Sequence, residues 1–220
     1  MGKIVLYTNP KGGVGKSCLC GIFANYLSQM GMKVAVIDAD VQQSLFRHRK
    51  RDLQGNPEAR LPWDIRNFQD KSPEQVANIL TKLKALPYVI AIDCPGNIID
   101  PMLKVIYPLA DIAVVPFHYD SDSLDATKMF CDVFKNHYGA KMFFVPNGIV
   151  VAEERRESLR QERDKAIETL KCYGFVTPRV KRTVIVGDYS TLITLDYCQK
   201  NAVKYAFEPI INELQKGGVE

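Results

Sequence analysis

Short apolar runs alternate with helix-like patterns along most of the chain. The apolar runs are continuous, and they predict strands at residues 3–8, 33–38, 88–93, 111–116 and 141–147, with a short sixth strand as an option at 174–176. The segments between them predict helices at residues 16–30, 73–85, 98–109, 121–138, 152–172 and 200–215.

Continuous apolar strands are typical of a parallel sheet that is covered on both faces. The alternation of strands and helices therefore predicts an α/β fold with a doubly wound, mainly parallel sheet and helices on both faces. Ligands of such sheets bind beyond the carboxyl ends of the strands, so functional side chains are expected directly after strands. Residues 55–63 are rich in turn formers and predict a surface loop, and residues 216–220 are expected to fray.

Composition narrows the class of protein. The chain has 220 residues, of which 46% are hydrophobic, so we expect one domain over residues 1–220 with a sizeable core. The formal charge of +4 permits an anionic partner without requiring one. The six cysteines form no C-x-x-C pair, which favours free thiols in a reducing compartment. Neither a signal peptide nor a membrane-length apolar run is found, so we expect a cytoplasmic protein.

A glycine-rich loop follows the first predicted strand and precedes the first predicted helix. Glycines leave backbone N–H groups free to curl around phosphate oxygens, and the helix adds its positive N-terminal end. Lys16 is expected to reach the β- and γ-phosphates, and the Ser17 hydroxyl is expected to ligate Mg²⁺. The candidate nucleotide-binding residues of the loop are Gly12, Gly13, Val14, Gly15, Lys16, Ser17 and Cys18.

The loop departs from the general phosphate-loop pattern G-x-x-x-x-G-K-[ST] at its first position, which is Pro10. A further lysine, Lys11, follows directly. A lysine at this edge can point out of its own site, enter the site of a partner and neutralise transition-state charge, as an arginine finger does. A plain glycine turn before a helix does not explain the whole order of strand, glycines, Lys-Ser and helix.

The run N-P-K-G-G-V-G-K-S at residues 9–17 resembles the deviant Walker A motif of the ParA/MinD family of ATPases, and the resemblance extends from residue 3 to about residue 210. It implies a P-loop NTPase fold, ATP and Mg²⁺ as ligands, and a homodimer that sandwiches two ATP molecules. It also implies that Lys11 and Lys16 act in catalysis, with Lys11 acting across the dimer.

Two carboxylates follow the second predicted strand. Asp38 and Asp40 stand beside the phosphate loop in a sheet of this kind, where they suit a magnesium ion and an attacking water. The resemblance to the family pattern D-x-D-P-Q implies that Asp40 positions or activates the water and that Asp38 supports the metal's water shell. Val41 takes the place of the usual Pro. A capping role for one of the two, Asp38, is the alternative.

The third predicted strand, residues 88–93, ends in Asp93. An apolar run that ends in Asp is the Walker B arrangement, in which the carboxylate holds magnesium through water. Gly96 can bring a backbone N–H near the γ-phosphate. The metal-binding candidates are therefore Ser17, Asp38 and Asp93.

The resemblance also assigns the adenine contacts. An Asn after the fifth strand hydrogen-bonds the base in the family, which is Asn147 here, and Pro178 follows a later strand next to the base. Asn and Pro are also common in ordinary turns, so the structural alternative stays open for both.

Basic residues gather in three places. They are Arg47 to Arg51, the set Arg155, Arg156, Arg160, Arg163 and Lys165, and the set Arg179, Lys181 and Arg182. Such sets can grip DNA phosphates without reading sequence. The second set is interleaved with acidic residues, which favours a solvated helix face. No DNA-reading segment precedes the first strand, so DNA binding is expected to be non-specific.

Three functions fit the residues. The first is a ParA-like partition ATPase with non-specific DNA and a centromere-binding adaptor of the ParB-like or small ribbon-helix-helix type. The second is a MinD-like switch that positions a protein assembly, such as conjugation machinery. The third is an iron–sulfur carrier ATPase, for which Cys94 and Cys131 are candidates at unsuitable spacing. The last helix has few cations after Phe207, which disfavours membrane binding.

Overall fold

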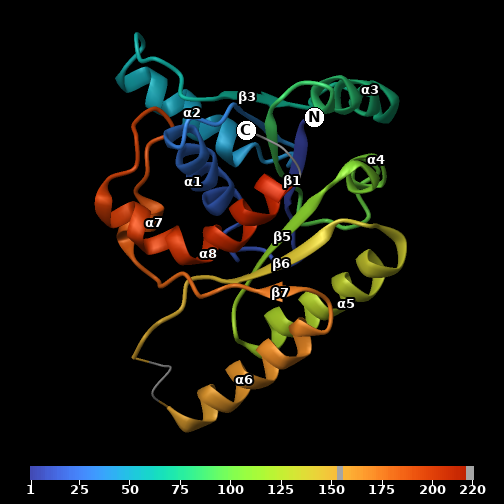
Figure 1. Ribbon diagram of the computed structural model, residues 1–220, viewed down its shortest axis with the longest axis vertical. Coiled ribbons are helices and arrows are strands. Elements are labelled where there is room, and N and C mark those ends of the chain that lie inside the picture. Colours follow the sequence, from blue (N-terminus) through green and yellow to red (C-terminus); the bar gives the residue numbers. More distant parts are fainter. Residues whose placement is uncertain (153–155, 217–220) are drawn as a thin grey trace.

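The computed structural model describes residues 1–152 and 156–216, and in these ranges it shows one seven-stranded sheet (Figure 1). The strand order is β3-β2-β4-β1-β5-β6-β7, and every strand pair is parallel. The strands are β1 (Lys3–Tyr7), β2 (Val34–Asp38), β3 (Asp64–Asn67), β4 (Val89–Asp93), β5 (Ile112–Phe117), β6 (Lys141–Pro146) and β7 (Phe175–Val176). The predicted doubly wound parallel α/β fold is confirmed.

Helices cover both faces of the sheet. Figure 1 shows α1, α2, α7 and α8 on one side and α3, α4, α5 and α6 on the other. Their bounds are α1 (Lys16–Gln29), α2 (Ser44–Gly55), α3 (Pro73–Lys84), α4 (Leu103–Ile106), α5 (Ser121–His137), α6 (Glu157–Lys171), α7 (Val184–Gly187) and α8 (Tyr197–Lys216), with a 3₁₀ turn η1 at Tyr107–Leu109. Within the described ranges, no helix has the length and apolar character that crossing a bilayer needs.

The apolar side chains of the strands contribute to two separate hydrophobic cores. Alternate residues of β1 point to opposite faces, so Val5 and Tyr7 join the core under α1 and α8, whereas Ile4 and Leu6 join the core under α3 to α6. Both cores exclude water from the central strands, and this is why polar side chains occur only where those strands end.

One predicted helix, 98–109, is helical only in its second part, as α4 followed by the 3₁₀ turn η1. Its first residues form turns, because the Asn97 side chain accepts from the Ile99 N–H (3.1 Å) and the Asp100 side chain accepts from the Met102 N–H (2.9 Å). Such local side-chain acceptors offer the backbone an alternative to a helix. Helix formation begins only at Leu103. The helix predicted at 152–172 begins at Glu157, and residues 153–155, which include Arg155, lie outside the described residues, as does the tail 217–220.

The apolar pattern of the sequence did not predict three of the elements. Strand β3 at the sheet edge has one apolar residue, Ile65, and α2 is made mostly of charged and polar residues. Helix α7 has only one turn. The loop predicted at 55–63 begins after Gly55, which ends α2, and its last residue is not on the surface. Trp63 is 3% exposed, because its indole N–H donates to the Asn25 side chain at 2.7 Å.

Arg49 corrects the expectation that the whole basic run 47–51 can face a partner. Its side chain is 4% exposed and stacks over the Trp63 ring at 4.0 Å. It donates to the Thr191 hydroxyl and carbonyl and to the Trp63 carbonyl at 2.9–3.0 Å. Burial lowers its pKa to about 10. Arg49 therefore fastens α2 to the loop before α8 and is not part of an exposed basic surface.

Replacing Arg49 tests this role. Arg49→Ala removes three hydrogen bonds and leaves the Thr191 and Trp63 carbonyls without their donor, so the free energy of unfolding is expected to fall by about 3 kcal/mol. Arg51→Ala, in the same helix but exposed, is expected to change it by less than about 0.5 kcal/mol. Urea unfolding measures both, and equal effects of the two variants would contradict the structural role of Arg49.

Candidate nucleotide-binding site

Parallel register brings the acidic and glycine-rich segments together. Tyr7 at the end of β1 pairs with Asp93 at the end of β4, and Asp38 at the end of β2 pairs with Asp93 on its other side. The loop after β1 and the two aspartates therefore meet at one edge of the sheet, where α/β proteins bind their ligands.

The loop 10–15 presents unpaired N–H groups. Gly13 and Gly15 have φ angles of +77° and +93°, a conformation that favours glycine. In the described part of the chain, no acceptor is paired with the backbone N–H of Gly12, Gly13, Val14 or Gly15. Helix α1 follows with no acidic residue in its first turn. Free N–H groups and an uncompensated helix N-terminus form a cradle that fits phosphate oxygens.

Two carboxamides hold this loop in place. Asn9, with no exposed surface, accepts from the Lys11 N–H (2.9 Å) and donates to the Pro116 carbonyl (2.8 Å) and the Thr127 hydroxyl (2.9 Å). Asn147, after β6, donates to the Val14 carbonyl at 2.8 Å. The sequence assigned no role to Asn9, although a polar residue directly after a buried strand is a usable signal.

Lys16 lies under the loop. Its side chain is 9% exposed, and its ammonium donates to the Lys11 carbonyl at 3.3 Å. Burial lowers its pKa, while Asp93 and Asp40 oppose that shift. A Cβ built on Gly96 would lie 3.6 Å from Lys16 Nζ and 3.5 Å from the Pro10 carbonyl oxygen, so the loop after β4 reaches the phosphate loop as expected.

Asp93 is the most perturbed acid of the site. It has no exposed surface, and neither carboxylate oxygen has a hydrogen-bond partner among the described residues. Burial raises its pKa to about 8; the Ser17 hydroxyl, which faces it without a hydrogen bond of ordinary geometry, and Lys16 oppose the shift. A buried carboxylate left without partners next to a hydroxyl suits a hydrated magnesium ion, so Ser17 and Asp93 fit the predicted metal role.

Asp38 has the capping role that the sequence analysis gave as the alternative, and it uses only one of its two oxygens for it. Its Oδ2 accepts from the Phe46 N–H at 2.9 Å and so caps the first turn of α2. Its Oδ1 is buried without a hydrogen-bond partner in the described ranges. Burial raises the pKa of Asp38, and the N–H groups it accepts from oppose this. One oxygen is therefore structural, and the other is available to a ligand.

Asp40 lies on the loop between β2 and α2. Its Oδ1 accepts from the Gln42 N–H at 2.8 Å, and its carbonyl accepts from the Gln43 N–H. It lines a hollow of about 400 Å³ with Asp38, Asn67 and Asp100. Asp40 is therefore more accessible than Asp38 and Asp93, as a group that handles a water molecule needs to be.

Lys11 points away from the loop interior. Its ammonium lies 4.0 Å from the Asp122 carboxylate at the start of α5, and both side chains are partly or largely exposed, at 37% and 84%. An exposed pair of this kind is weak. The side chain of Lys11 therefore does not line the cradle that its own backbone helps to form.

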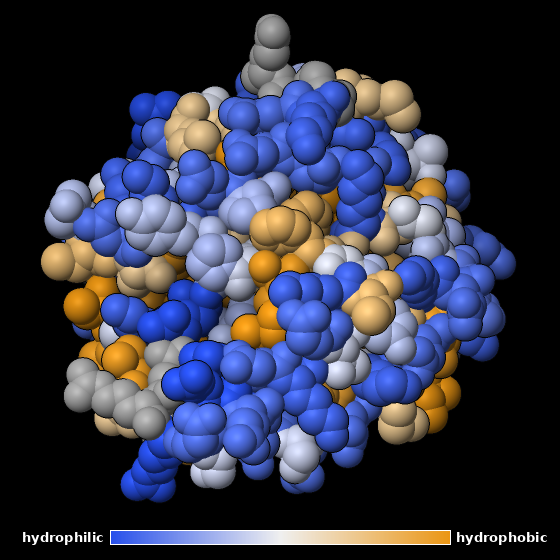
Figure 2. Space-filling model, turned by 60° about the horizontal axis from the view of Figure 1, so that its bottom comes forward, coloured by the Kyte–Doolittle hydropathy of each residue, from blue (hydrophilic) through white to orange (hydrophobic). Residues whose placement is uncertain are grey.

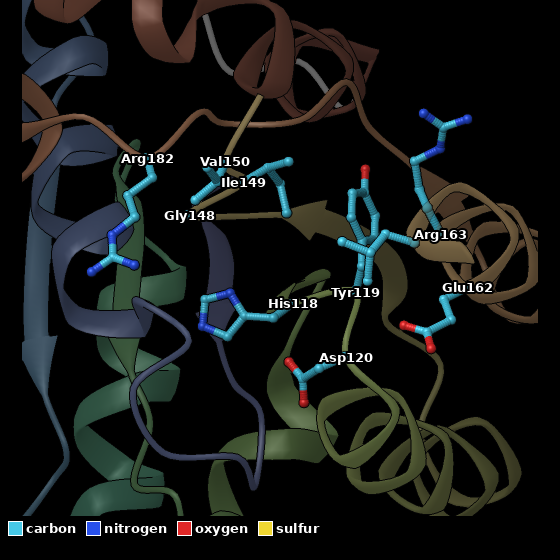
Figure 3. A pocket seen from close by; sticks show the side chains of 10 residues that line it. His118, Tyr119, Asp120, Gly148, Ile149, Val150, Glu162, Arg163 and Arg182 are labelled. Carbon is cyan, nitrogen blue, oxygen red and sulfur yellow. The ribbon is translucent and has the colours of Figure 1, made fainter. Parts of the chain in front are cut away.

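The segment after β6 separates the loop from a second cavity of about 330 Å³ (Figure 3). Figure 3 shows His118 beside Gly148, and Arg182 directed toward the same space. His118 Nδ1 is hydrogen-bonded to the Asn147 carbonyl at 2.8 Å. Pro178 lies elsewhere, on a groove that it lines with Phe175, Tyr205 and Pro209 of β7 and α8. The structure thus brings Asn147, but not Pro178, onto the phosphate loop.

The cysteines offer no metal centre. Cys94 and Cys131 are fully buried, so they cannot reach a partner chain at the surface. Cys18, in the first turn of α1, donates to the Val186 carbonyl, and burial raises its pKa to about 11. No group of three or more His, Cys, Asp or Glu with metal-binding geometry occurs in residues 1–152 and 156–216. Cys94 and Cys131 are therefore not available as ligands of an iron–sulfur cluster shared with a partner chain.

Exposed cations remain on two surfaces. Arg47, Lys50 and Arg51 of α2 are exposed, as are Arg179, Lys181 and Arg182 after β7. On α6, Arg160, Arg163 and Lys171 pair with Glu157, Asp164 and Glu168, which fits the predicted solvated face. Figure 2, turned so that the lower side of Figure 1 comes forward, shows a mostly hydrophilic surface with smaller hydrophobic groups.

Comparison with known proteins identifies what the chain resembles. A family model described as the CobQ/CobB/MinD/ParA nucleotide binding domain matches residues 5–187. A plasmid partition protein from Borrelia burgdorferi is similar at 18% identity and a TM-score of 0.70, covering 96% of this chain and 98% of that one. The MinC:MinD cell division complex of Aquifex aeolicus gives 17% identity and a TM-score of 0.72, covering 96% of both chains. No curated protein matches the sequence.

A third similar structure is apo McdA from Cyanothece, with 15% identity, a TM-score of 0.72, and coverage of 97% of this chain and 100% of that one. At these identities the likeness shows a shared fold.

The buried Asp93 predicts a pH dependence for the ligand-free protein. Its folded pKa of about 8 exceeds the unfolded value of about 4. The unfolded chain therefore loses this proton first as pH rises, and the contribution to stability present below pH about 4 is lost by pH about 8. At pH 8 the free energy of unfolding of Asp93→Asn is expected to exceed that of the wild type by on the order of 2–4 kcal/mol. Below pH about 4 the two are expected to differ little.

Denaturant unfolding in EDTA at pH 4, 6 and 8 measures this effect, with the exposed Asp125→Asn as control. Parallel stability curves for the wild type and Asp93→Asn would show that Asp93 titrates normally.

Proposed function

The chain belongs to the CobQ/CobB/MinD/ParA family of nucleotide-binding domains, and on that premise we propose that it is a ParA-like ATPase that segregates DNA. In this proposal the protein binds ATP with Mg²⁺, dimerises around two nucleotides and then binds DNA non-specifically. A centromere-binding adaptor, ParB-like or of the ribbon-helix-helix type, stimulates hydrolysis. The observation that carries it is the loop of free N–H groups with two lysines, of which Lys16 donates to the loop itself and Lys11 extends to Asp122 outside it.

The proposed chemistry divides between the two lysines and Asp40. Lys16, already under the loop, would contact the β- and γ-phosphates. Lys11, which points outward, would neutralise charge in the site of the partner subunit. Asp40 would position the attacking water. Ser17, Asp38 and Asp93 would hold a magnesium ion, which would neutralise phosphate charge when bound.

Non-specific DNA binding is assigned to the exposed cations that the structure leaves on α2 and after β7. Arg49 is removed from this set by its burial. In a dimer these residues would occur twice, and phosphate contacts of this kind are lost steeply as salt is raised. The protein would be nucleoid-associated in its ATP state.

A second candidate function is a MinD-like switch that positions a protein assembly. It is favoured by exposed apolar side chains beside the loop after Asp93: Ile98 (43%), Ile99 (77%), Met129 (69%) and Val133 (54%). Ile98 and Val133 share one small surface hollow. Apolar side chains in such a place suit contact with a protein rather than with DNA.

The ATP-dependent assembly is tested by sizing with ADP and with a slowly hydrolysed ATP analogue. The wild type is expected to be a monomer with ADP and a dimer with the analogue. Lys16→Ala is expected to lose nucleotide binding, whereas Lys11→Ala is expected to bind nucleotide and lose stimulated hydrolysis. A Lys11→Ala variant with full stimulated hydrolysis would show that Lys11 does not act across a dimer.

Gel shifts with unrelated DNA sequences at low and high salt separate the two candidate functions. Binding that needs the ATP analogue, ignores sequence and falls with salt supports partition. No DNA binding, with nucleotide-dependent dimers intact, supports the protein-positioning switch.

Asp40→Ala tests the hydrolytic step. Because Asp40 is accessible and Lys16 and the loop stay intact, ATP affinity is expected to change less than threefold while hydrolysis is lost, which traps the dimer. Unstimulated hydrolysis by the wild type is expected at ~10⁻² s⁻¹ or less, the range of switch-type P-loop proteins. Val41→Ala, one exposed residue further along, serves as control. Normal turnover by Asp40→Ala would mean that another group handles the water.

A further inference from the structure

Asn147 touches the phosphate loop itself, which its expected contact with adenine does not require. Its Nδ2 donates to the Val14 carbonyl at 2.8 Å, across 133 residues of sequence. We propose that Asn147 is a positioning residue that orients the phosphate loop before nucleotide binds. The inference rests on the proposed nucleotide-binding function and adds the means by which the empty loop keeps its shape.

The backbone of Asn147 is itself fixed on both sides. Its N–H donates to the Phe117 carbonyl at the end of β5 (2.9 Å), and its carbonyl is hydrogen-bonded to His118 Nδ1 (2.8 Å). The His118 N–H in turn donates to the buried Ser123 hydroxyl at the start of α5 (3.0 Å). The carboxamide therefore extends from a rigid point where two strands end, as a positioning group needs to.

The hydrogen bond determines where the next N–H points. The carbonyl of Val14 and the N–H of Gly15 belong to one trans peptide, so they point in opposite directions. Holding the Val14 carbonyl toward Asn147 therefore directs the Gly15 N–H away from Asn147, within the same peptide plane. That N–H has no acceptor among the described residues and remains available to a phosphate oxygen.

The fit between the two residues is close. A Cβ built on Gly15 would lie 2.2 Å from Asn147 Nδ2, well inside contact distance. Gly15 also has φ +93°, which L side chains rarely adopt. Glycine at position 15 therefore allows both the left-handed backbone conformation and the close approach of the Asn147 carboxamide.

A loop that already has its binding shape loses little conformational freedom when a ligand binds. The hydrogen bond from Asn147 therefore raises the affinity for any phosphate chain, with or without a base. A base contact, in contrast, raises affinity only for ligands that carry a base. This difference separates the two roles, which a loss of ATP affinity alone cannot do.

The experiment compares MgATP with magnesium tripolyphosphate, which has the phosphates and no base, by calorimetry. Asn147→Ala is expected to weaken both ligands by a similar factor, about 3- to 10-fold, the effect of one hydrogen bond. Asn201→Ala, an exposed asparagine on α8, is the matched control and is expected to change neither. Weaker ATP with unchanged tripolyphosphate would overturn the proposal in favour of a base contact alone.

A second measurement does not depend on any ligand. The order parameter of the Gly15 N–H, from ¹⁵N relaxation of the ligand-free protein, is expected to fall in Asn147→Ala from a rigid value near 0.85 toward 0.6, and to stay unchanged in Asn201→Ala. An unchanged value in Asn147→Ala would overturn the proposal. If the wild type binds neither ligand, the proposed nucleotide-binding function fails, and this outcome is distinct from both results above.

Discussion

The site depends on one electrostatic constraint, a carboxylate buried at the end of the central strand β4 without a hydrogen-bond partner in residues 1–152 and 156–216. Lys16 and Ser17, the first two residues of α1, face Asp93, and the parallel register of β1, β2 and β4 fixes the position of its backbone. Burial opposes charge on both Asp93 and Lys16 in the ligand-free state. In the proposed function, a bound phosphate and divalent cation would favour both charges, so part of the cost of burying them would be offset on binding.

Hydrogen bonds from side chains beyond the loop keep it open opposite this carboxylate. Asn9 and Asn147 reach it from the ends of β1 and β6, and each anchors a different peptide of the loop. Such anchoring is needed because a glycine-rich segment has the largest conformational entropy to lose. The same glycines that let N–H groups converge would leave the empty loop disordered without external acceptors and donors.

The sequence predicts the strands, the sheet class and the residues at the strand ends, because burial on both faces imposes a strong apolar pattern. The sequence does not predict the elements that side-chain hydrogen bonds, rather than burial of apolar residues, hold in place. Strand β3 and helix α2 are held by Arg49, Trp63 and Thr191, whose pairing crosses 142 residues and has no local pattern. Turns made by Asn97 and Asp100 override the helical pattern at 98–102. The hydrogen bond from the Phe46 N–H to Asp38 and the position of Asn147 against Gly15 likewise depend on contacts that only the folded chain shows.

Helix α2 is held along its first three turns, by Asp38 at Phe46 and by Arg49 and Asp52 at the loop 190–191. The segment Ala39–Gln43 that carries Asp40 is therefore a short bridge between a central strand and a helix that hydrogen bonds hold in place. Its rearrangements are confined to a few peptide rotations, which are fast compared with the movement of whole helices. In the proposed function, a rearrangement that brings Asp40 to a water molecule would therefore involve this short bridge and not a displacement of α2.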